Sequence, residues 1–208
     1  MNAQTQHLHV TPEDLRDRFA FGMTRLFRWF ADRLFGERYA TRAVVLETVA
    51  AVPGMVGATL QHLTALRRLT DDAGRVRMLA EEAANERMHL TTFLAIARPS
   101  RLDRALILVA QGVFFNLYVL LYLLSARTAH RMVGYFEEEA VVSYTRFLKA
   151  IDSGRIANCP APASAISYWA LAPNARLRDV VLAVRGDEIG HRDANHRLAD
   201  ALNAQREH

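Results

Sequence analysis

The sequence predicts an all-α protein, and three observations support that prediction. Helix-forming residues dominate the 208-residue chain, whereas glycine (10) and proline (6) are sparse. No stretch alternates between apolar and polar residues as a half-buried strand does. Glu86 stands three residues before His89, and Glu188 three residues before His191, so each pair shares one helix face. We therefore expect one helical domain over residues 1–208.

The first helix is predicted to start at Thr11-Pro12, after a loose polar tail at residues 1–10. Threonine caps helix N-termini, and proline is favoured at the first helical position. In the helix that follows, one apolar stripe contains Phe19, Met23, Leu26, Phe27, Phe30 and Leu34. Arginines flank this stripe, which is typical of a helix lying flat on a membrane. An amphipathic helix packed on a core would show the same stripe.

Four further helices are expected, and each contains acidic residues in an apolar stripe. Their ranges are residues 41–69, 75–97, 128–152 and 176–203. Pro53-Gly54 should break or kink the first of them, and Pro99 should end the second. Three prolines lie within residues 155–175, which are therefore expected to form a connecting loop with Tyr168-Trp169 turned inward.

Residues 105–126 contain no charged side chain, so this run is long enough to cross a membrane. Crossing would place Glu86 and Glu137 on opposite sides of the bilayer, where they could not share one site. Gln111 and Asn116 also weaken a spanning helix. We therefore expect a helix sunk in one leaflet and paired with the first helix. A fully buried bundle helix is the alternative.

Two Glu-x-x-His helices and one glutamate from each of two more helices form the ligand set of a di-iron or di-manganese bundle. The candidates are Glu47, Glu86, His89, Glu188, His191 and one of Glu137, Glu138 and Glu139. Oxygen and nitrogen ligands suit iron or manganese better than thiolate-binding metals. Spacing leaves the choice within the glutamate triplet open, although Tyr144, two turns after Glu137, favours Glu137. A single Glu-x-x-His often arises by chance, whereas two copies are stronger support.

Other polar residues have simpler interpretations. Asn85 and Asp187 each adjoin a candidate ligand and either orient its imidazole or are ordinary helix residues. The histidines outside the motifs are expected in tails (His7, His9, His208) or as surface and supporting groups (His62, His130, His196). Cys159 is the only cysteine, so no internal disulfide exists.

The net charge is +4 with histidine neutral and comes almost entirely from arginine, since Lys149 is the only lysine. The arginines are interleaved with large apolar residues, so attraction to anionic lipid fits better than nucleic-acid binding. We expect no nucleic-acid partner. The first 16 residues lack the features of a secretory signal or a transit peptide, which predicts a protein on the cytosolic side.

Five stretches resemble the alternative oxidase family, the cyanide-insensitive, non-haem quinol oxidases. They are residues 46–57, 85–89, 111–116, 130–135 and 192–196, and the resemblance extends over about residues 15–200. It implies a ferritin-like four-helix bundle with a di-iron centre, that is, two Fe ions, plus two membrane-interfacial helices. It also implies that Glu137 is the ligand from the glutamate triplet.

The resemblance further implies roles around that centre. A redox-active tyrosine is expected at Tyr144, and the quinol pocket at Arg42, Leu46, Glu139, Ala140 and Ser143. Asn85, Asp187 and Trp169 are expected to support the ligands. The implied reaction oxidises two ubiquinols and reduces one dioxygen to two waters, without proton pumping. The implied assembly is a homodimer on one leaflet, at the cytoplasmic face of a bacterial inner membrane.

Two departures and two alternatives accompany this hypothesis. Val142 and Gly190 stand where many family members have histidine, and the regulatory cysteine of plant members is absent. Another di-iron carboxylate enzyme, such as a plastoquinol oxidase or a quinone hydroxylase, would keep the ligands and change the pocket. A ferritin-like storage protein would need no quinol pocket, and the uncharged run at 105–126 argues against it.

Overall fold

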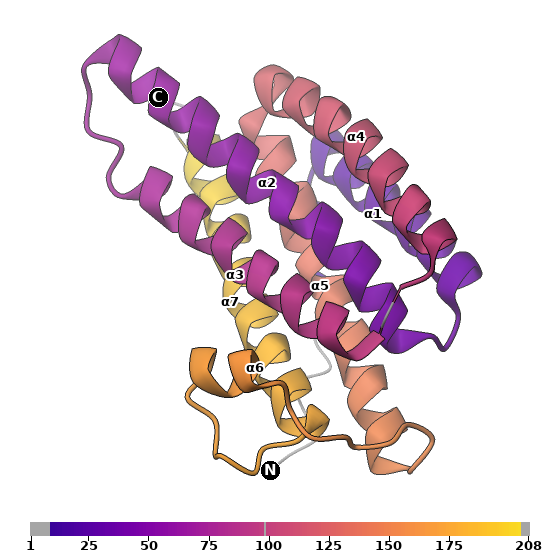
Figure 1. The fold of residues 1–208 in the computed structure, drawn as a ribbon. Helices are drawn as coiled ribbons and strands as arrows, with labels where there is room; N and C mark the ends of the chain where they lie inside the picture. The colour runs from indigo at the N-terminus through magenta and orange to yellow at the C-terminus, as the bar shows by residue number, and fades with distance from the viewer. Residues whose placement is uncertain (1–8, 98, 205–208) are drawn as a thin grey trace.

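The computed structural model describes residues 9–97 and 99–204, which form seven helices (Figure 1). Their bounds are α1 Leu15–Phe35, α2 Tyr39–Arg68, α3 Arg75–Ala97, α4 Arg101–Leu124, α5 Ala126–Asp152, α6 Ala163–Tyr168 and α7 Leu177–Ala204. The described residues contain no β-sheet, only one isolated bridge between Pro160 and Arg176. The predicted all-α fold is therefore confirmed.

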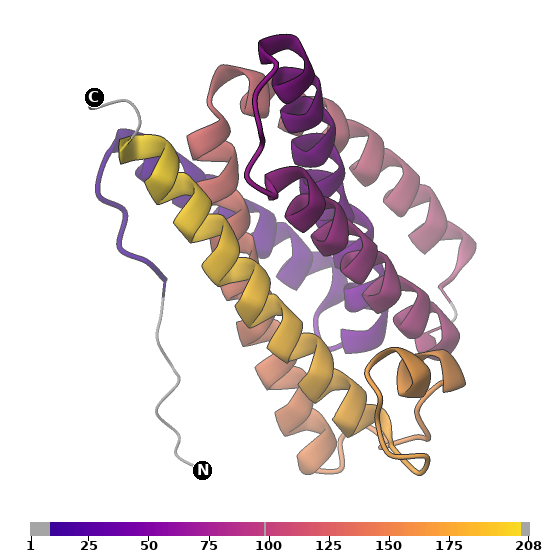
Figure 2. The ribbon, with the colours of Figure 1, turned by 90° about the vertical axis from the view of Figure 1, so that its left-hand side faces the viewer.

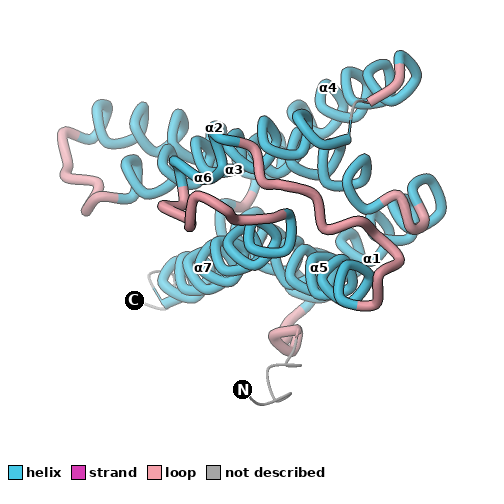
Figure 3. Tube along the Cα trace, turned by 60° about the horizontal axis from the view of Figure 1, so that its bottom comes forward, coloured by secondary structure: helices cyan, strands magenta, loops and turns pink. Residues whose placement is uncertain are grey.

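The helices form two layers, which Figure 3 shows from one end. One layer contains α2, α3 and α4, and the other contains α1, α5 and α7. The most extensive helix pairings are α2 with α3 and α5 with α7, and Figure 2 shows α7 lying along α5. These four long helices make the bundle, while α4 packs on α2 and α1 packs on α5 at its flank. The bundle therefore has the four-helix architecture expected for a ligand set drawn from four helices.

The N-terminus of α1 differs from the prediction, because the cap is Asp14 and not Thr11. The Asp14 carboxylate accepts hydrogen bonds of 2.9 Å from the backbone nitrogens of Arg16 and Asp17. A carboxylate at this position satisfies free N–H groups and favours the helix dipole. The segment before the helix is also held in place, since His9 and Val10 both bind Glu138. Of the expected loose tail, residues 1–8 lie outside the described residues.

Pro53 does not end α2, which continues to Arg68. Pro53 and Gly54 are both buried, and Gly54 lies where α2 meets α3. A Cβ atom on Gly54 would lie only 2.6 Å from the Leu79 carbonyl oxygen, so the two backbones are in close contact there. Packing against α3 therefore holds the helix through a residue that would break an isolated one.

Helix α4 begins at a capping box, which was not among the predicted helix starts. The Ser100 hydroxyl accepts from the Asp103 nitrogen (3.1 Å), and the Asp103 carboxylate accepts from the Ser100 nitrogen (2.9 Å). By length and composition, α2 and α4 are both apolar enough to cross a membrane, but α2 is largely buried and α4 largely exposed. The alternative of a fully buried helix at 105–126 is therefore wrong.

The connection between α5 and α7 is not a pure loop, because it contains the short helix α6. The two aromatic residues at the end of α6 also differ from each other. Trp169 reaches into the bundle, where its indole nitrogen donates to Asp187 at 2.8 Å. Tyr168 remains 46% exposed, so the prediction that it turns inward is wrong.

Candidate metal centre

The six predicted ligand residues converge inside the bundle. Glu47 comes from α2, Glu86 and His89 from α3, Glu137 from α5, and Glu188 and His191 from α7. They form two overlapping groups, and within each group one ligand atom per residue lies within 4.8 Å of the others. The first group is Glu47, Glu86, His89 and Glu188, and the second is Glu86, Glu137, Glu188 and His191. Because Glu86 and Glu188 belong to both, the geometry matches two adjacent metal sites with two bridging carboxylates.

The chemistry of this cluster fits a pair of divalent cations. Glu86 and Glu188 are each 1% exposed, and His89 is fully buried. Both Glu86 carboxylate oxygens and one Glu188 oxygen lack a well-directed hydrogen bond among the described residues, although His191 Nδ1 lies 2.7 Å from Glu86. Buried carboxylates without partners are costly. The four carboxylates carry four negative charges in total, which two divalent cations would balance.

The pKa values of the ligand residues also reflect the negative charge gathered in the cluster. Burial raises the pKa of Glu47 and of Glu137 well above the usual range, and neighbouring carboxylates raise it further. Burial lowers the pKa of His191, but the close carboxylates of Glu188 and Glu86 outweigh it and bring the value to about 11. Cations entering this cluster would therefore displace protons from carboxyl and imidazolium groups.

Three consecutive glutamates of α5 point to three different surroundings. Glu137 joins the cluster, whereas Glu138 points the other way and accepts from His196 at 2.9 Å and from His9 at 2.6 Å. Glu139 forms an ion pair of 2.6 Å with Arg28 of α1. Successive helical side chains turn by about 100°, as 3.6 residues per turn require, so only one of the three can face the other ligands.

A carboxylate outside the cluster orients His89. Asp187 lies 3.2 Å from His89 Nε2 and also accepts from Asn85 (3.0 Å) and Trp169 (2.8 Å). With its Nε2 proton directed at Asp187, His89 presents Nδ1 to Glu47 and Glu86. A carboxylate behind a ligating imidazole fixes its tautomer and raises its basicity. The three residues predicted to support the ligands thus meet at one point beside His89.

Tyr144 contacts the ligand Glu47 at the carboxylate oxygen that does not face His89. Its hydroxyl donates to the Glu47 carboxylate, and its ring stacks on Phe93 with 5.7 Å between centroids. Burial raises the pKa of Tyr144 well above its usual value, and the charge of Glu47 adds to the effect. The phenol therefore stays protonated next to the cluster.

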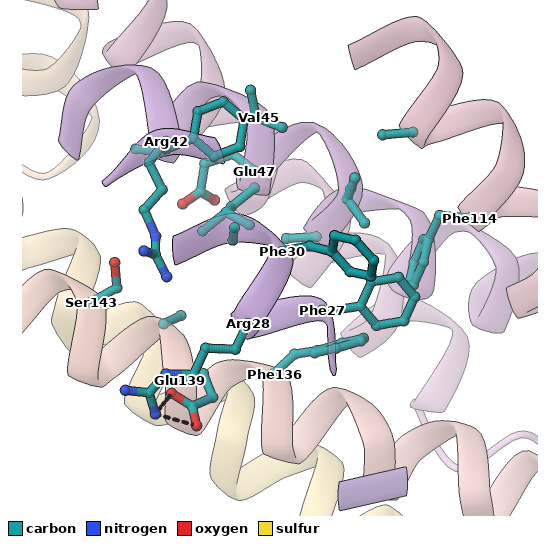
Figure 4. A pocket seen from close by; sticks show the side chains of 18 of the residues that line it. Phe27, Arg28, Phe30, Arg42, Val45, Glu47, Phe114, Phe136, Glu139 and Ser143 are labelled. Atoms are coloured by element: carbon teal, nitrogen blue, oxygen red, sulfur yellow. Dashed lines mark hydrogen bonds and ion pairs between the residues drawn. The ribbon is translucent and has the colours of Figure 1, made fainter. Parts of the chain in front are cut away.

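An apolar cavity of about 660 Å³ reaches the cluster from the side of α1 and α4 (Figure 4). The predicted pocket residues Arg42, Leu46, Glu139, Ala140 and Ser143 all line it, as do Glu47, Glu137, Glu188 and Tyr144. Figure 4 shows the aromatic wall, made by Phe27, Phe30, Phe114 and Phe136. The cavity therefore joins an apolar outer face to the carboxylates at its inner end.

The polar part of the cavity wall includes Arg28, which was not among the predicted pocket residues, and Asp32 supports this wall from behind it. Arg28, expected beside the lipid-facing stripe, binds Glu139 and lies 3.5 Å from Asp32, which in turn pairs with Arg42. This chain of charges links α5, α1 and α2. The spacing of Arg28 and Asp32 by four residues was a visible sign that both lie on one helix face.

The other histidines lie outside the cluster. His62 is exposed, and His7 and His208 lie outside the described residues. His130 and His196 are buried and bind Asn195 and Glu138, respectively. Asn195 also donates to both oxygens of the buried Glu82. Glu82 and Asn195 were missed, although each lies four residues from a predicted ligand and so on the same helix face.

A four-helix bundle that brings four carboxylates and two histidines together in two overlapping groups defines the class of dinuclear carboxylate proteins. The model of the alternative oxidase family matches residues 1–200. The chain belongs to the alternative oxidase family, which confirms the family resemblance and the predicted di-iron bundle fold.

Three relatives show the extent of the similarity. "Ubiquinol oxidase 1c, mitochondrial" of Arabidopsis thaliana is 54% identical over 192 residues, which are 92% of this chain and 58% of the relative. "Ubiquinol oxidase, mitochondrial" of Batrachochytrium dendrobatidis is 54% identical, and the match covers 94% of this chain and 62% of the relative. "Ubiquinol oxidase 2, mitochondrial" of Nicotiana tabacum is 53% identical, and the match covers 92% of this chain and 65% of the relative. The chain thus spans 58–65% of the length of these relatives.

Proposed function

We propose that this chain is a di-iron quinol oxidase, which oxidises two ubiquinols to quinones while one dioxygen becomes two waters. The observation that carries the proposal is the apolar cavity whose inner end contains Glu47, Glu137 and Glu188. A lipid-soluble, two-electron donor fits such a cavity better than a charged substrate does. The names of the relatives, which are ubiquinol oxidases, support this choice of donor.

The six clustered residues would hold the metal pair, with Glu86 and Glu188 shared between the two ions. Iron is the metal that the family implies, and the carboxylate and imidazole donors suit it. When bound, two iron ions supply the redox chemistry that takes electrons from quinol and passes them to dioxygen. The protein provides the ligands, the dry cavity and the proton-carrying groups around it.

The polar residues of the cavity wall suit binding of a quinol head group. Arg42 and Ser143 present donors to one of its oxygens, and Glu139 presents an acceptor to a hydroxyl group. Arg28 and Asp32 hold Glu139 and Arg42 in place through the ion pairs described above. At the inner end, the Tyr144 phenol holds a proton against Glu47, so an electron and a proton are available together beside the metal ligands.

The exposed faces of α1 and α4 support attachment to one leaflet of a quinone-containing membrane. Exposed apolar side chains include Trp29, Phe30 and Leu34 on α1 and Leu108, Leu117 and Leu120 on α4. Both helices line the cavity, so quinol would enter it directly from lipid. In this arrangement no helix crosses the bilayer, so the reaction would pump no protons. The homodimer and the cytoplasmic face of a bacterial inner membrane stay our predictions.

Oxygen consumption by purified, iron-loaded protein tests the proposal. We expect cyanide-resistant uptake with a short-chain ubiquinol at two quinols per dioxygen and no hydroxylated product. Arg42→Gln should lower kcat/KM by on the order of 10- to 100-fold, because a hydrogen bond to a charged group contributes ~1.5–3 kcal/mol. The control Arg68→Gln removes an exposed arginine at the end of the same helix. Iron-loaded protein that consumes no oxygen with quinol would refute the proposed function.

A further inference from the structure

A second buried tyrosine, Tyr122 of α4, is hydrogen-bonded to a histidine. Its hydroxyl lies 3.2 Å from Nε2 of His130, and the two rings meet edge-on with 5.3 Å between centroids. Tyr122 is 7% and His130 1% exposed. Neither residue belongs to the metal cluster or to the cavity lining, so the pair has no part in the function proposed above.

The surrounding hydrogen bonds fix the direction of this contact. The Asn195 amide nitrogen donates to Glu82 and to the His191 carbonyl, so the Asn195 oxygen faces Nδ1 of His130, 2.9 Å away. An amide oxygen only accepts, so Nδ1 carries the proton. In the neutral imidazole Nε2 is then an acceptor, and the Tyr122 hydroxyl donates to it.

The protonation states suit transfer of that phenol proton. Burial lowers the pKa of His130 to about 4, so the imidazole is neutral and can accept a proton. Burial raises the pKa of Tyr122 to about 12, so the phenol keeps its proton in the ground state. A phenol becomes strongly acidic once it loses an electron, and a hydrogen-bonded base is then needed.

A row of aromatic rings leads from Tyr122 to the cavity that reaches the metal cluster. The centroid of the Tyr118 ring lies 6.2 Å from that of Tyr122 and 5.7 Å from that of Phe114. Phe114 in turn lines the cavity. Tyr118 is 1% exposed and its hydroxyl has no hydrogen-bond partner among the described residues. Burial raises its pKa well above the usual value, and the charges of Tyr122, Glu82 and Glu137 contribute.

We propose that Tyr122 and His130 form a reserve electron donor, which reduces the oxidised metal pair by one electron when no quinol is bound. The inference rests on the proposed function, because the oxidised metal pair is the oxidant. Tyr122 loses one electron, which passes through the Tyr118 ring to the metal pair, and one proton, which moves to His130 Nε2. A neutral tyrosyl radical and an imidazolium remain. An electron from the next quinol and the His130 proton restore the phenol.

Electron paramagnetic resonance of iron-loaded protein treated with hydrogen peroxide tests this donor. Tyr144→Phe serves as the background, because it removes the tyrosine nearest the ligands. We expect a neutral tyrosyl signal, narrowed by ring-deuterated tyrosine, that falls at least fivefold when Tyr122→Phe is added. The matched control is Tyr135→Phe. Tyr135 is also buried edge-on to a histidine, 5.3 Å from His196, but its hydroxyl has no hydrogen-bond partner among the described residues.

A second variant guards against misfolding of the first. His130→Gln keeps Tyr122 but removes its base, so it should lose the same signal. Metal content and circular dichroism are measured for every variant. A signal that survives Tyr122→Phe, or that Tyr135→Phe removes equally, would overturn the inference. If wild-type protein binds no iron or oxidises no quinol, the proposed function fails; if both persist while the Tyr122 signal is absent, only the reserve donor fails.

Discussion

Substituting Gly54 with alanine should destabilise the bundle where α2 and α3 come closest. An added Cβ would lie 2.6 Å from the Leu79 carbonyl oxygen and 2.9 Å from the Ala83 nitrogen. Both are backbone atoms, so relief requires the helices to move apart. Overpacking costs ~1–3 kcal/mol. For a chain of this length each kcal/mol shifts Tm by about 2–4 °C, so Tm should fall by about 2–12 °C.

The same substitution should weaken metal binding. Gly54 lies seven residues after Glu47, and Leu79 lies seven residues before Glu86. The contact is therefore two turns away from one ligand on each helix. Separating the helices at this contact would move Glu47 away from Glu86 and His89, which share one group of ligands. We expect lower iron occupancy after loading at limiting metal.

Thermal unfolding followed by circular dichroism, with and without iron, measures both effects. Gly22→Ala is the control, since an added Cβ on Gly22 of α1 would meet nothing within 4 Å. Alanine is favoured over glycine in a helix by ~1 kcal/mol, so this variant should equal or exceed wild-type stability. If Gly54→Ala unfolds at or above the wild-type temperature, or if the two variants behave alike, the close approach of α2 and α3 does not limit packing at Gly54.

Three further predictions concern the ligands, their protonation and the apolar face. Glu137→Ala should abolish tight iron binding while Glu138→Ala retains it, and iron analysis showing the reverse would place the wrong glutamate in the centre. In chelator-treated protein, the pKa of His191 is raised from 6.5 to about 11, so its stabilising contribution is complete below pH 6.5 and is lost as the pH rises through 11. Unfolding midpoints of His191→Gln should therefore differ from wild type at pH 6 and converge above pH 11; a constant difference contradicts this. Leu117→Glu on α4 should reduce sedimentation with liposomes, whereas Leu182→Glu on α7, also an exposed leucine, should not; equal retention of both would exclude α4 from the membrane contact.

The ligand helices could be predicted from sequence because their signal is local. Two residues three positions apart share a helix face whatever the tertiary structure, so Glu86 with His89 and Glu188 with His191 needed only a helix. The start of α1 is different. Two good signals for a helix N-terminus lie close together, at Thr11-Pro12 and at Asp14. The contact of Asp14 with Arg127 of α5 favours Asp14 as the cap. Such a contact between α1 and α5 leaves no trace in the local pattern.

The place of Arg28 in the cavity wall could not be predicted for the same reason. Arg28 reads as an ordinary flank of an amphipathic stripe, and nothing in α1 alone shows that it reaches Glu139 of α5. The burial of His130 likewise depends on three other helices, which supply Tyr122, Asn195 and Glu82. Local spacing identifies residues that share a face, whereas the choice of partner across helices requires the packed structure.

The cavity wall also explains why its residues should not act independently. Glu139 is held by Arg28, Arg28 contacts Asp32, and Asp32 pairs with the largely buried Arg42. Removing Asp32 leaves the buried Arg42 without this counter-charge beside an apolar cavity, which costs more than the lost pair itself gains. Residues of one ion-pair network show coupled effects. This row of charges joins α1 to both α2 and α5, so it fixes the helix that covers the cavity as well as the charged groups that line it.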